Sequence, residues 1–134
     1  MTSYLLDTNH ASPLVTPGHP LRESVLLKLD EGDQFAVCVP VVAETLFGIG
    51  MLPRAVQNRS EWKRLEPFIP CYVPDVDDAE AAADLQIVLR RRGWQLATVD
   101  ALIAALALRY GLALLTTDRD FKAVPELPCE NWLG

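Results

Sequence analysis

Four acidic residues follow a predicted strand or lie near the beginning of a predicted helix: Asp7, Glu44, Asp100 and Asp118. Asp7 directly follows the apolar run Ser3–Leu6, and Asp118 follows a second short apolar run. Glu44 and Asp100 lie close to the N-terminal ends of two helices predicted from their apolar residues. Ligands of open parallel α/β sheets bind beyond the carboxyl ends of the strands, where such helices begin. All four carboxylates can therefore meet at one edge of a sheet.

Four carboxylates in one place repel one another unless they are protonated or bridged by cations. A site made of oxygen ligands alone favours magnesium or manganese. Such ions position a water molecule, lower its pKa and offset the charge that develops on a phosphate group. The four acids together therefore indicate metal-assisted hydrolysis of a phosphodiester. Taken singly, each acid is also explained by capping or turn formation, and Asp100 suits the positive end of a helix dipole.

A zinc site is not indicated. His10 and His19 have no cysteine or histidine partner at a spacing typical of zinc ligands. His19 lies between glycine and proline and is assigned to a loop, whereas His10 is close enough in sequence to Asp7 to lie near the site.

The elements that must position the acids alternate between short apolar strands and helices. Strands are predicted at 3–6, 35–39, 71–73 and 112–115, with a last one at the sheet edge within 129–133. Helices are predicted at 11–15, 21–29, 41–48, 52–65, 77–92 and 98–110. This alternation predicts an α/β domain with a central, mainly parallel sheet. The length of 134 residues and the 50% content of hydrophobic residues predict a single domain over 1–134.

The helix predicted at Thr98–Tyr110 carries Asp100 in its first turn. Every residue from 101 to 108 is apolar, so no face is left for water and the helix is expected inside the domain. Thr98 is predicted as its N-cap, and Gly111 as the residue that ends it. The helix before it is predicted to begin with a cap formed by Asp77 and Glu80.

Glu44 is predicted to project from the apolar side of a helix that has Pro40 at its first position. A carboxylate on that side requires a partner. A bound cation would provide one.

The net charge of −6 argues against a protein that coats nucleic acid, because phosphate binding normally needs a basic surface. It does not exclude a nuclease whose acids are gathered in one pocket. The three cysteines are widely spaced and are predicted to be reduced core thiols. The chain has no apolar stretch of 18 residues and no recognisable signal peptide, so a cytoplasmic protein without a membrane segment is expected.

Two features allow more than one interpretation. Arg90, Arg91 and Arg92 suit the last turn of a helix, or they contact RNA phosphate or a partner. Trp62 and Trp94 are either packing residues or platforms on which bases of single-stranded RNA stack. Trp132, near the C-terminus, receives no functional role.

Four segments together resemble the PIN-domain family, especially the VapC-type toxins of prokaryotic toxin–antitoxin pairs. They are LLDTN at 5–9, VVAETLFG at 41–48, TVDALIAALAL at 98–108 and LLTTDRDF at 114–121. Each motif is weak alone, but their order and spacing fit the family and they span nearly the whole chain.

The resemblance implies a compact three-layer α/β/α fold and a magnesium-dependent ribonuclease, with manganese as an alternative ion. It also implies a cytoplasmic toxin, a cognate antitoxin that inhibits it, and a homodimer. The family's acids correspond to Asp7, Glu44, Asp100 and Asp118, as catalytic residues and metal ligands. Near the fourth position Thr117 and Asp120 are further candidates, and Asp118 is preferred because it is nearer the strand end. Thr8 and Asn9 either hydrogen-bond ligands or substrate, or cap the next helix.

Two other classes of function compete with the nuclease. One is a PIN-like binding or scaffold protein with little activity, which acts through protein partners. The other is an acidic-pocket phosphotransfer protein. A phosphatase with an aspartyl nucleophile would have a second acid two residues after Asp7, where Asn9 stands. A receiver-like domain would have a lysine after Leu115, and none is present there.

Overall fold

Five short parallel strands form the central sheet of the computed structural model, which describes residues 1–134. The strands are β1 (Ser3–Leu6), β2 (Gln34–Cys38), β3 (Cys71–Tyr72), β4 (Ala113–Leu115) and β5 (Cys129–Glu130). Their spatial order is β3-β2-β1-β4-β5, and all four pairings are parallel. The predicted sheet is thus confirmed, and it is entirely rather than mainly parallel. β1 lies at its centre, with Leu5 beside Ala36 and Leu114.

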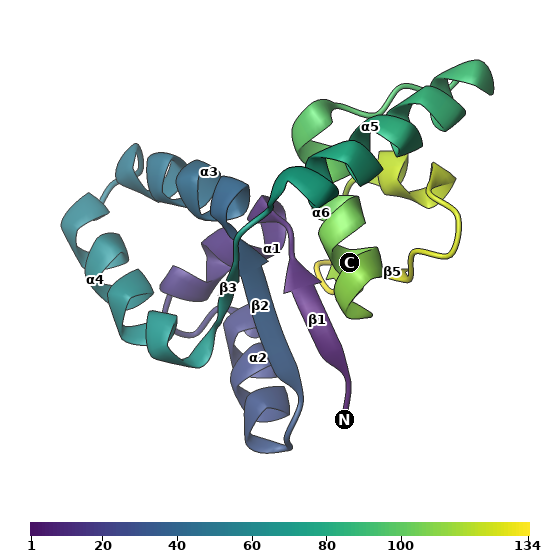
Figure 1. Cartoon of the computed structure of the whole chain (residues 1–134). Helices are drawn as coiled ribbons and strands as arrows, with labels where there is room; N and C mark the ends of the chain where they lie inside the picture. Colours follow the sequence, from purple (N-terminus) through teal and green to yellow (C-terminus); the bar gives the residue numbers. More distant parts are fainter.

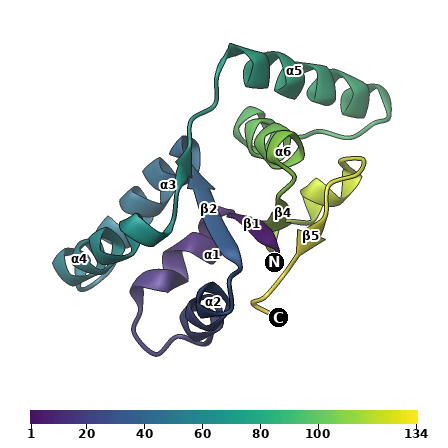
Figure 2. The same ribbon diagram turned by 60° about the horizontal axis from the view of Figure 1, so that its bottom comes forward.

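Helices cover both faces of the sheet (Figures 1 and 2). They are α1 (Thr8–Ala11), α2 (Pro20–Asp30), α3 (Val39–Gly50), α4 (Ala55–Leu65), α5 (Val76–Arg91) and α6 (Thr98–Tyr110). Figure 2 shows α1 and α2 on one side of β1 and β2, and α6 on the other side. α5 packs on the outside of α6. This is the expected α/β/α layering, and none of the helices is long and apolar enough to cross a membrane.

The core explains why the strands read as uninterrupted apolar runs. A strand that is covered by helices on both faces must be apolar at every position. In β1 and β2, Tyr4 and Phe35 are buried and stack with their ring centroids 5.0 Å apart. Trp132, from the C-terminal segment, meets Tyr4 edge-on at 5.0 Å. The C-terminal segment is thereby packed against the two central strands.

Several predicted boundaries and environments were wrong in detail. α5 begins with a capping box between Asp75 and Asp78, not with Asp77 and Glu80. The N-cap of α6 is Ala97, without a side-chain hydrogen bond, so Thr98 is the first helical residue rather than the cap. The predicted burial of α6 holds for most of its length.

Two further expectations on burial need correction. Leu108 of α6 is 41% exposed, although the uniformly apolar sequence predicted that no side of this helix faces water. The three cysteines are free, as predicted, but Cys71 is exposed and is therefore not a core thiol. Pro40 is the second residue of α3, which begins at Val39, the last residue of the predicted strand.

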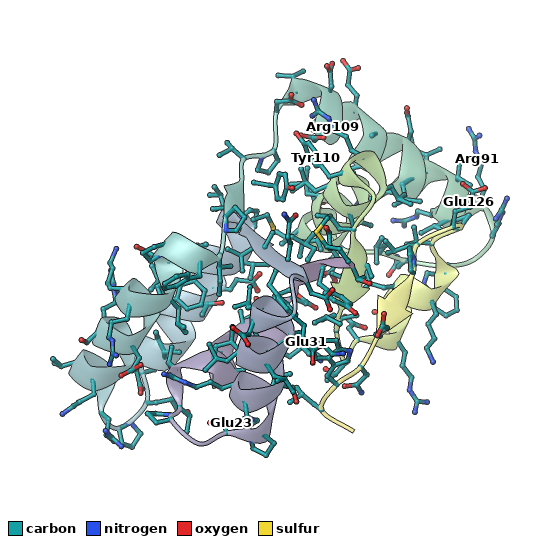
Figure 3. The ribbon with its side chains drawn as sticks, turned by 90° about the horizontal axis from the view of Figure 1, so that it is seen from below. Glu23, Glu31, Arg91, Arg109, Tyr110 and Glu126 are labelled. Atoms are coloured by element: carbon teal, nitrogen blue, oxygen red, sulfur yellow. The ribbon has the colours of Figure 1, made fainter.

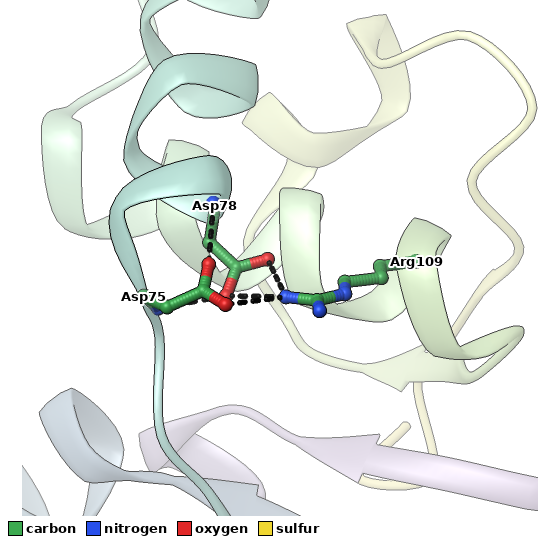
Figure 4. Close-up of polar contacts among 3 residues, drawn as sticks. All are labelled: Asp75, Asp78 and Arg109. Atoms are coloured by element: carbon green, nitrogen blue, oxygen red, sulfur yellow. Dashed lines mark hydrogen bonds and ion pairs between the residues drawn. The ribbon is translucent and has the colours of Figure 1, made fainter.

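α5 and α6 are joined by ion pairs at one end. Figure 3 shows Arg109 and Tyr110 at the C-terminal end of α6, next to α5. The Arg109 guanidinium lies over the Tyr110 ring, 5.1 Å from its centroid. Its Nη1 lies 3.0 Å from Asp78 Oδ1 and 3.2 Å from Asp75 Oδ2 (Figure 4). The ion pairs of Arg109 therefore help to position α6, the helix that also carries Asp100.

Candidate active site

Asp7 is held at the carboxyl end of β1 and is only 7% exposed. Its Oδ1 accepts a hydrogen bond from the Thr8 N–H at 2.9 Å, and it caps α1. Its Oδ2 accepts from Thr116 Oγ1 at 2.7 Å and from Asn9 Nδ2 at 3.3 Å. Its own N–H donates to the Leu115 carbonyl, so the ends of β1 and β4 position this carboxylate together.

Asp100 is half-buried in the first turn of α6 and senses the other acids. Its pKa is raised to about 6, first by burial and then by the negative charges of Asp7, Asp118, Glu44 and Asp120. The structure therefore brings the other three sequence-predicted acids, and Asp120 as well, within electrostatic range of Asp100. Asp7, Glu44 and Asp100 come from separate parts of the chain, whereas Asp118 and Asp120 share the segment after β4.

Glu44 was predicted to project from the apolar side of its helix, and this prediction is wrong. α3 buries Val41, Thr45 and Ile49, and Glu44 is exposed beside them. Its carboxylate therefore needs no internal partner. α3 also exposes Phe47, so apolar residues occupy both sides of this helix and its pattern could not identify the buried face.

Asp118 and Asp120 are the two candidates for the fourth acid, and the charges of both raise the pKa of Asp100. Asp118 is half-buried, and its Oδ1 accepts a hydrogen bond from the Asp120 N–H at 2.9 Å. Its N–H donates to Thr116 Oγ1 at 3.0 Å. Asp120 is exposed, and its carboxylate makes no hydrogen bond. Thr117 is exposed as well, and its N–H donates to Asn9 Oδ1 at 3.2 Å.

A hydrogen-bond network that the sequence did not reveal connects Asp7, through Asn9 and His10, to the C-terminal segment. The backbone N–H of Trp132 donates to His10 Nε2 at 3.0 Å, and His10 Nδ1 lies 2.6 Å from Asn9 Oδ1. Because Nε2 accepts, Nδ1 carries the proton and donates to Asn9. Burial lowers the pKa of His10 to about 4 despite the Asp7 charge, so the ring is neutral. Trp132 is 122 positions from His10, and no local pattern links them.

Comparison with known proteins gives a family match over most of this chain. The model of the PIN domain matches residues 4–127. The chain belongs to the PIN-domain family. Ribonuclease VapC11 from Mycobacterium tuberculosis is 31% identical to it over 102 residues, covering 73% of this chain and 72% of that protein. The chain is a VapC-type member of the family.

Solved structures of PIN-domain complexes share this fold. The VapBC2 complex of Rickettsia felis, bound to a DNA fragment from its promoter, superimposes with a TM-score of 0.82 at 23% identity, covering 98% of this chain and 99% of that chain. FitAcB from Neisseria gonorrhoeae gives a TM-score of 0.75 at 26% identity, covering 96% of each chain. The PIN fold predicted from four motifs is thus confirmed over nearly the whole chain.

The donor chemistry of this PIN domain fits a divalent cation. As the side chains stand, no three acidic, histidine or cysteine side chains are grouped closely enough to hold a metal ion. No lysine or arginine pairs with Asp7, Glu44, Asp100, Asp118 or Asp120, however. The negative charge around Asp100 is thus not neutralised by any basic side chain. Carboxylate oxygens are the ligands that magnesium and manganese prefer.

Proposed function

We propose that this PIN domain hydrolyses RNA phosphodiester bonds as a magnesium-dependent endoribonuclease, with manganese as an alternative ion. Asp7, Glu44, Asp100 and Asp118 are the proposed metal ligands and catalytic residues. The observation that carries the proposal is the convergence of acids around the half-buried Asp100: the charges of Asp7, Asp118, Glu44 and Asp120 all act on it, and no lysine or arginine pairs with any of the five. Such a concentration of unpaired negative charge is explained by a cation, and the similarity to VapC11 supports RNA as the substrate.

The protein's own groups orient the proposed ligands before any ion binds. Asp7 Oδ2 accepts two hydrogen bonds and Oδ1 accepts one, which leaves acceptor capacity on Oδ1 for a ligand. Thr116 fixes Asp7 and the Asp118 backbone through one hydroxyl group. A divalent ion held here would lower the pKa of a water nucleophile and offset charge on the phosphate.

Asp118 is the proposed fourth ligand, and Asp120 is the alternative. Asp118 caps the turn after β4 with one oxygen, which limits its orientation and leaves the second oxygen free. Asp120 is exposed and has no hydrogen bond that orients its carboxylate. An oriented carboxylate loses less conformational entropy when it binds an ion.

RNA cleavage by the isolated protein tests the proposal. Purified, antitoxin-free protein is incubated with a mixed RNA pool and magnesium or manganese, beside an Asp7→Asn/Asp100→Asn double variant whose fold is verified by circular dichroism. We expect cleavage by the parent alone. Equal cleavage by both proteins would place the activity elsewhere, and no cleavage together with no ion bound at millimolar concentration would favour a binding or scaffold protein.

We also propose that a cognate antitoxin inhibits this chain, that it forms a homodimer and that it acts in the cytoplasm. Large apolar residues are exposed on α3, α4 and their connection: Phe47, Met51, Leu52 and Val56. Exposed apolar residues gathered in one region are typical of protein interaction sites. A solved structure with this fold is a toxin–antitoxin complex from Klebsiella pneumoniae. Co-expression with a candidate antitoxin, followed by mass determination of the protein with and without it, tests the antitoxin and the dimer.

A further inference from the structure

A pocket of about 450 Å³ opens beside the acids, where α5 ends and the chain leads into α6. Gln86, Arg90, Trp94, Gln95 and Asp120 are among its lining residues. Its volume lies in the range of pockets that hold small organic ligands. Asp120 belongs both to this pocket and to the charges that raise the pKa of Asp100. The pocket is therefore adjacent to the candidate active site.

Of the three tryptophans, Trp94 alone does not pack in or against the hydrophobic core. Trp62 is 2% exposed and Trp132 packs against the core, whereas Trp94 is 42% exposed. The backbone of Trp94 is nevertheless held in place, because its backbone N–H donates to the Leu89 carbonyl at 2.9 Å just after α5 ends. Core packing therefore does not account for a large, exposed aromatic ring in the wall of a pocket.

The segment beneath Trp94 is ordered by Gln86. Its Nε2 donates to the Leu96 carbonyl at 2.9 Å and to Thr98 Oγ1 at 3.2 Å. These bonds leave the Gln86 Oε1 as an available acceptor in the pocket wall, and the Gln95 side chain makes no hydrogen bond. Amide groups of this kind can pair with the edge of a nucleic acid base.

Positive charge lies next to the aromatic ring. Arg90, Arg91 and Arg92 make no ion pair within the chain, although the whole protein carries a net charge of −6. Only Arg90 of the three lines the pocket. A free guanidinium beside an exposed ring matches a phosphate joined to a stacked base.

We propose that this pocket binds one unpaired nucleotide of single-stranded RNA, with its base stacked on Trp94 and its phosphate paired with Arg90. The proposal rests on the proposed ribonuclease function and adds a substrate subsite next to the metal ligands. Unstacked bases of single strands are the usual targets of RNA recognition, because their faces and edges are accessible. An acidic peptide would use the arginines but would not require the exposed ring.

Binding to an inactive protein separates this proposal from the cleavage chemistry. In an Asp100→Asn background, the Kd for a fluorescent random-sequence RNA about ten nucleotides long is measured by anisotropy. We expect Trp94→Ala to weaken binding about tenfold, the loss typical of one stacked base, and Trp94→Phe to retain most of the affinity. Arg90→Ala is expected to weaken binding a few-fold and to reduce its salt dependence.

Arg91→Ala is the matched control. It removes the same charge from the same end of α5, but Arg91 does not line the pocket and stands at the outer end of this helix (Figure 3). Its Kd should stay within about twofold of the parent. An equal loss in Arg90→Ala and Arg91→Ala, or an unchanged Kd in Trp94→Ala, would overturn the proposal.

Kinetics in the active protein give the second readout. Trp94→Ala should raise KM with little change in kcat, because the ring binds substrate away from the reacting phosphate. A fall in kcat alone would also overturn the subsite. If the parent binds RNA through Trp94 but does not cleave it, the proposed function fails and the subsite stands. If the parent cleaves RNA and Trp94→Ala binds and cleaves RNA as the parent does, the proposed function stands and the subsite fails.

Discussion

Thr116 connects two of the acids through a single hydroxyl group. Its Oγ1 donates to Asp7 Oδ2 at 2.7 Å and accepts from the Asp118 N–H at 3.0 Å. One donor and one acceptor are thus both used, at a residue that is 5% exposed. The role of Thr116 could not be predicted from the sequence, because the contact joins residues 109 positions apart. Its hydroxyl group donates the shortest of the three hydrogen bonds that orient the Asp7 carboxylate.

Thr116→Val removes this hydroxyl and nearly preserves the side-chain shape. We expect the Kd for manganese to rise about 10- to 100-fold, the usual effect of losing an outer partner of a ligating carboxylate. RNA cleavage should fall by a similar factor. Thr116→Ser, which keeps the hydroxyl, is the control and should behave like the parent. Calorimetry gives the affinity, and an unchanged Kd in the valine variant would contradict the role assigned to Thr116.

His10 makes the stability of the fold depend on pH. Its pKa is about 4 in the folded protein, whereas its ordinary value is 6.5. As the pH falls, the unfolded chain is therefore protonated at His10 before the folded protein is. Above pH 6.5 the neutral ring costs the fold no stability. As the pH falls from 6.5 toward 4, protonation of the unfolded chain lowers the free energy of unfolding. Asp100 acts in the opposite direction between pH 6 and 3.8, because its pKa is raised. The stability curve of the parent alone therefore does not isolate His10.

Comparison with His10→Gln isolates the contribution of His10. Glutamine can accept from the Trp132 N–H and donate to Asn9, but it does not titrate. Between pH 7 and 4, the parent should lose about 3 kcal/mol more free energy of unfolding than the variant. Urea unfolding at the two pH values measures the difference. Parallel losses in both proteins would show that His10 is not held neutral.

At the scale of elements, the sequence predicted the five strands and the five longer helices, but not their exact ends or faces. The short helix predicted at 11–15 is instead α1 at Thr8–Ala11 followed by a 3-10 turn at Ser12–Val15, and the 3-10 turns at Glu66–Phe68 and Arg119–Ala123 were not predicted. Alternating apolar runs suffice to place a parallel strand, since both of its faces are buried. Caps are harder, because Asp75, Asp77 and Asp78 all suit the first turn of α5 and only the fold selects among them. α3 has apolar residues on both sides, so the orientation of Glu44 depended on which side the sheet covers.

Asp78 provides a prediction at this scale. It is 2% exposed, accepts from the Asp75 N–H at 2.8 Å and pairs with Arg109. Asp78→Ala should lower the free energy of unfolding by about 2 kcal/mol, typical of hydrogen bonds to a buried charged group. Asp77→Ala, one position earlier and exposed, is the control and should have little effect. Equal losses in urea unfolding would argue against the ion pair between α5 and α6.

For the whole molecule, the acids that serve the proposed chemistry also oppose folding. Ionised Asp100 is disfavoured by burial and by four neighbouring acids above its pKa of about 6. The sequence predicted the meeting of carboxylates, since strand ends and helix beginnings share one sheet edge. It could not predict the His10 network or the Trp94 pocket, which depend on contacts between distant segments and on loop conformation.

Thermal unfolding should reveal this conflict. In a chelating buffer above pH 7, Asp100→Asn should melt at a higher temperature than the parent, because a repelled charge is removed. Magnesium should stabilise the parent by about 1.4 kcal/mol at ten times its Kd, and should not stabilise the variant. Equal stabilisation of both proteins by magnesium would place the ion away from Asp100.

The central claim, that the acids form one metal centre, is tested most directly by manganese titration in a calorimeter. We predict saturable binding to the parent and none to the folded Asp7→Asn/Asp100→Asn variant. Asp118→Asn should weaken binding more than Asp120→Asn, since Asp118 is the proposed fourth ligand. Binding to the double variant with the affinity of the parent would contradict the account, because the ion would then lie outside the acids that β1, α3, α6 and β4 bring together.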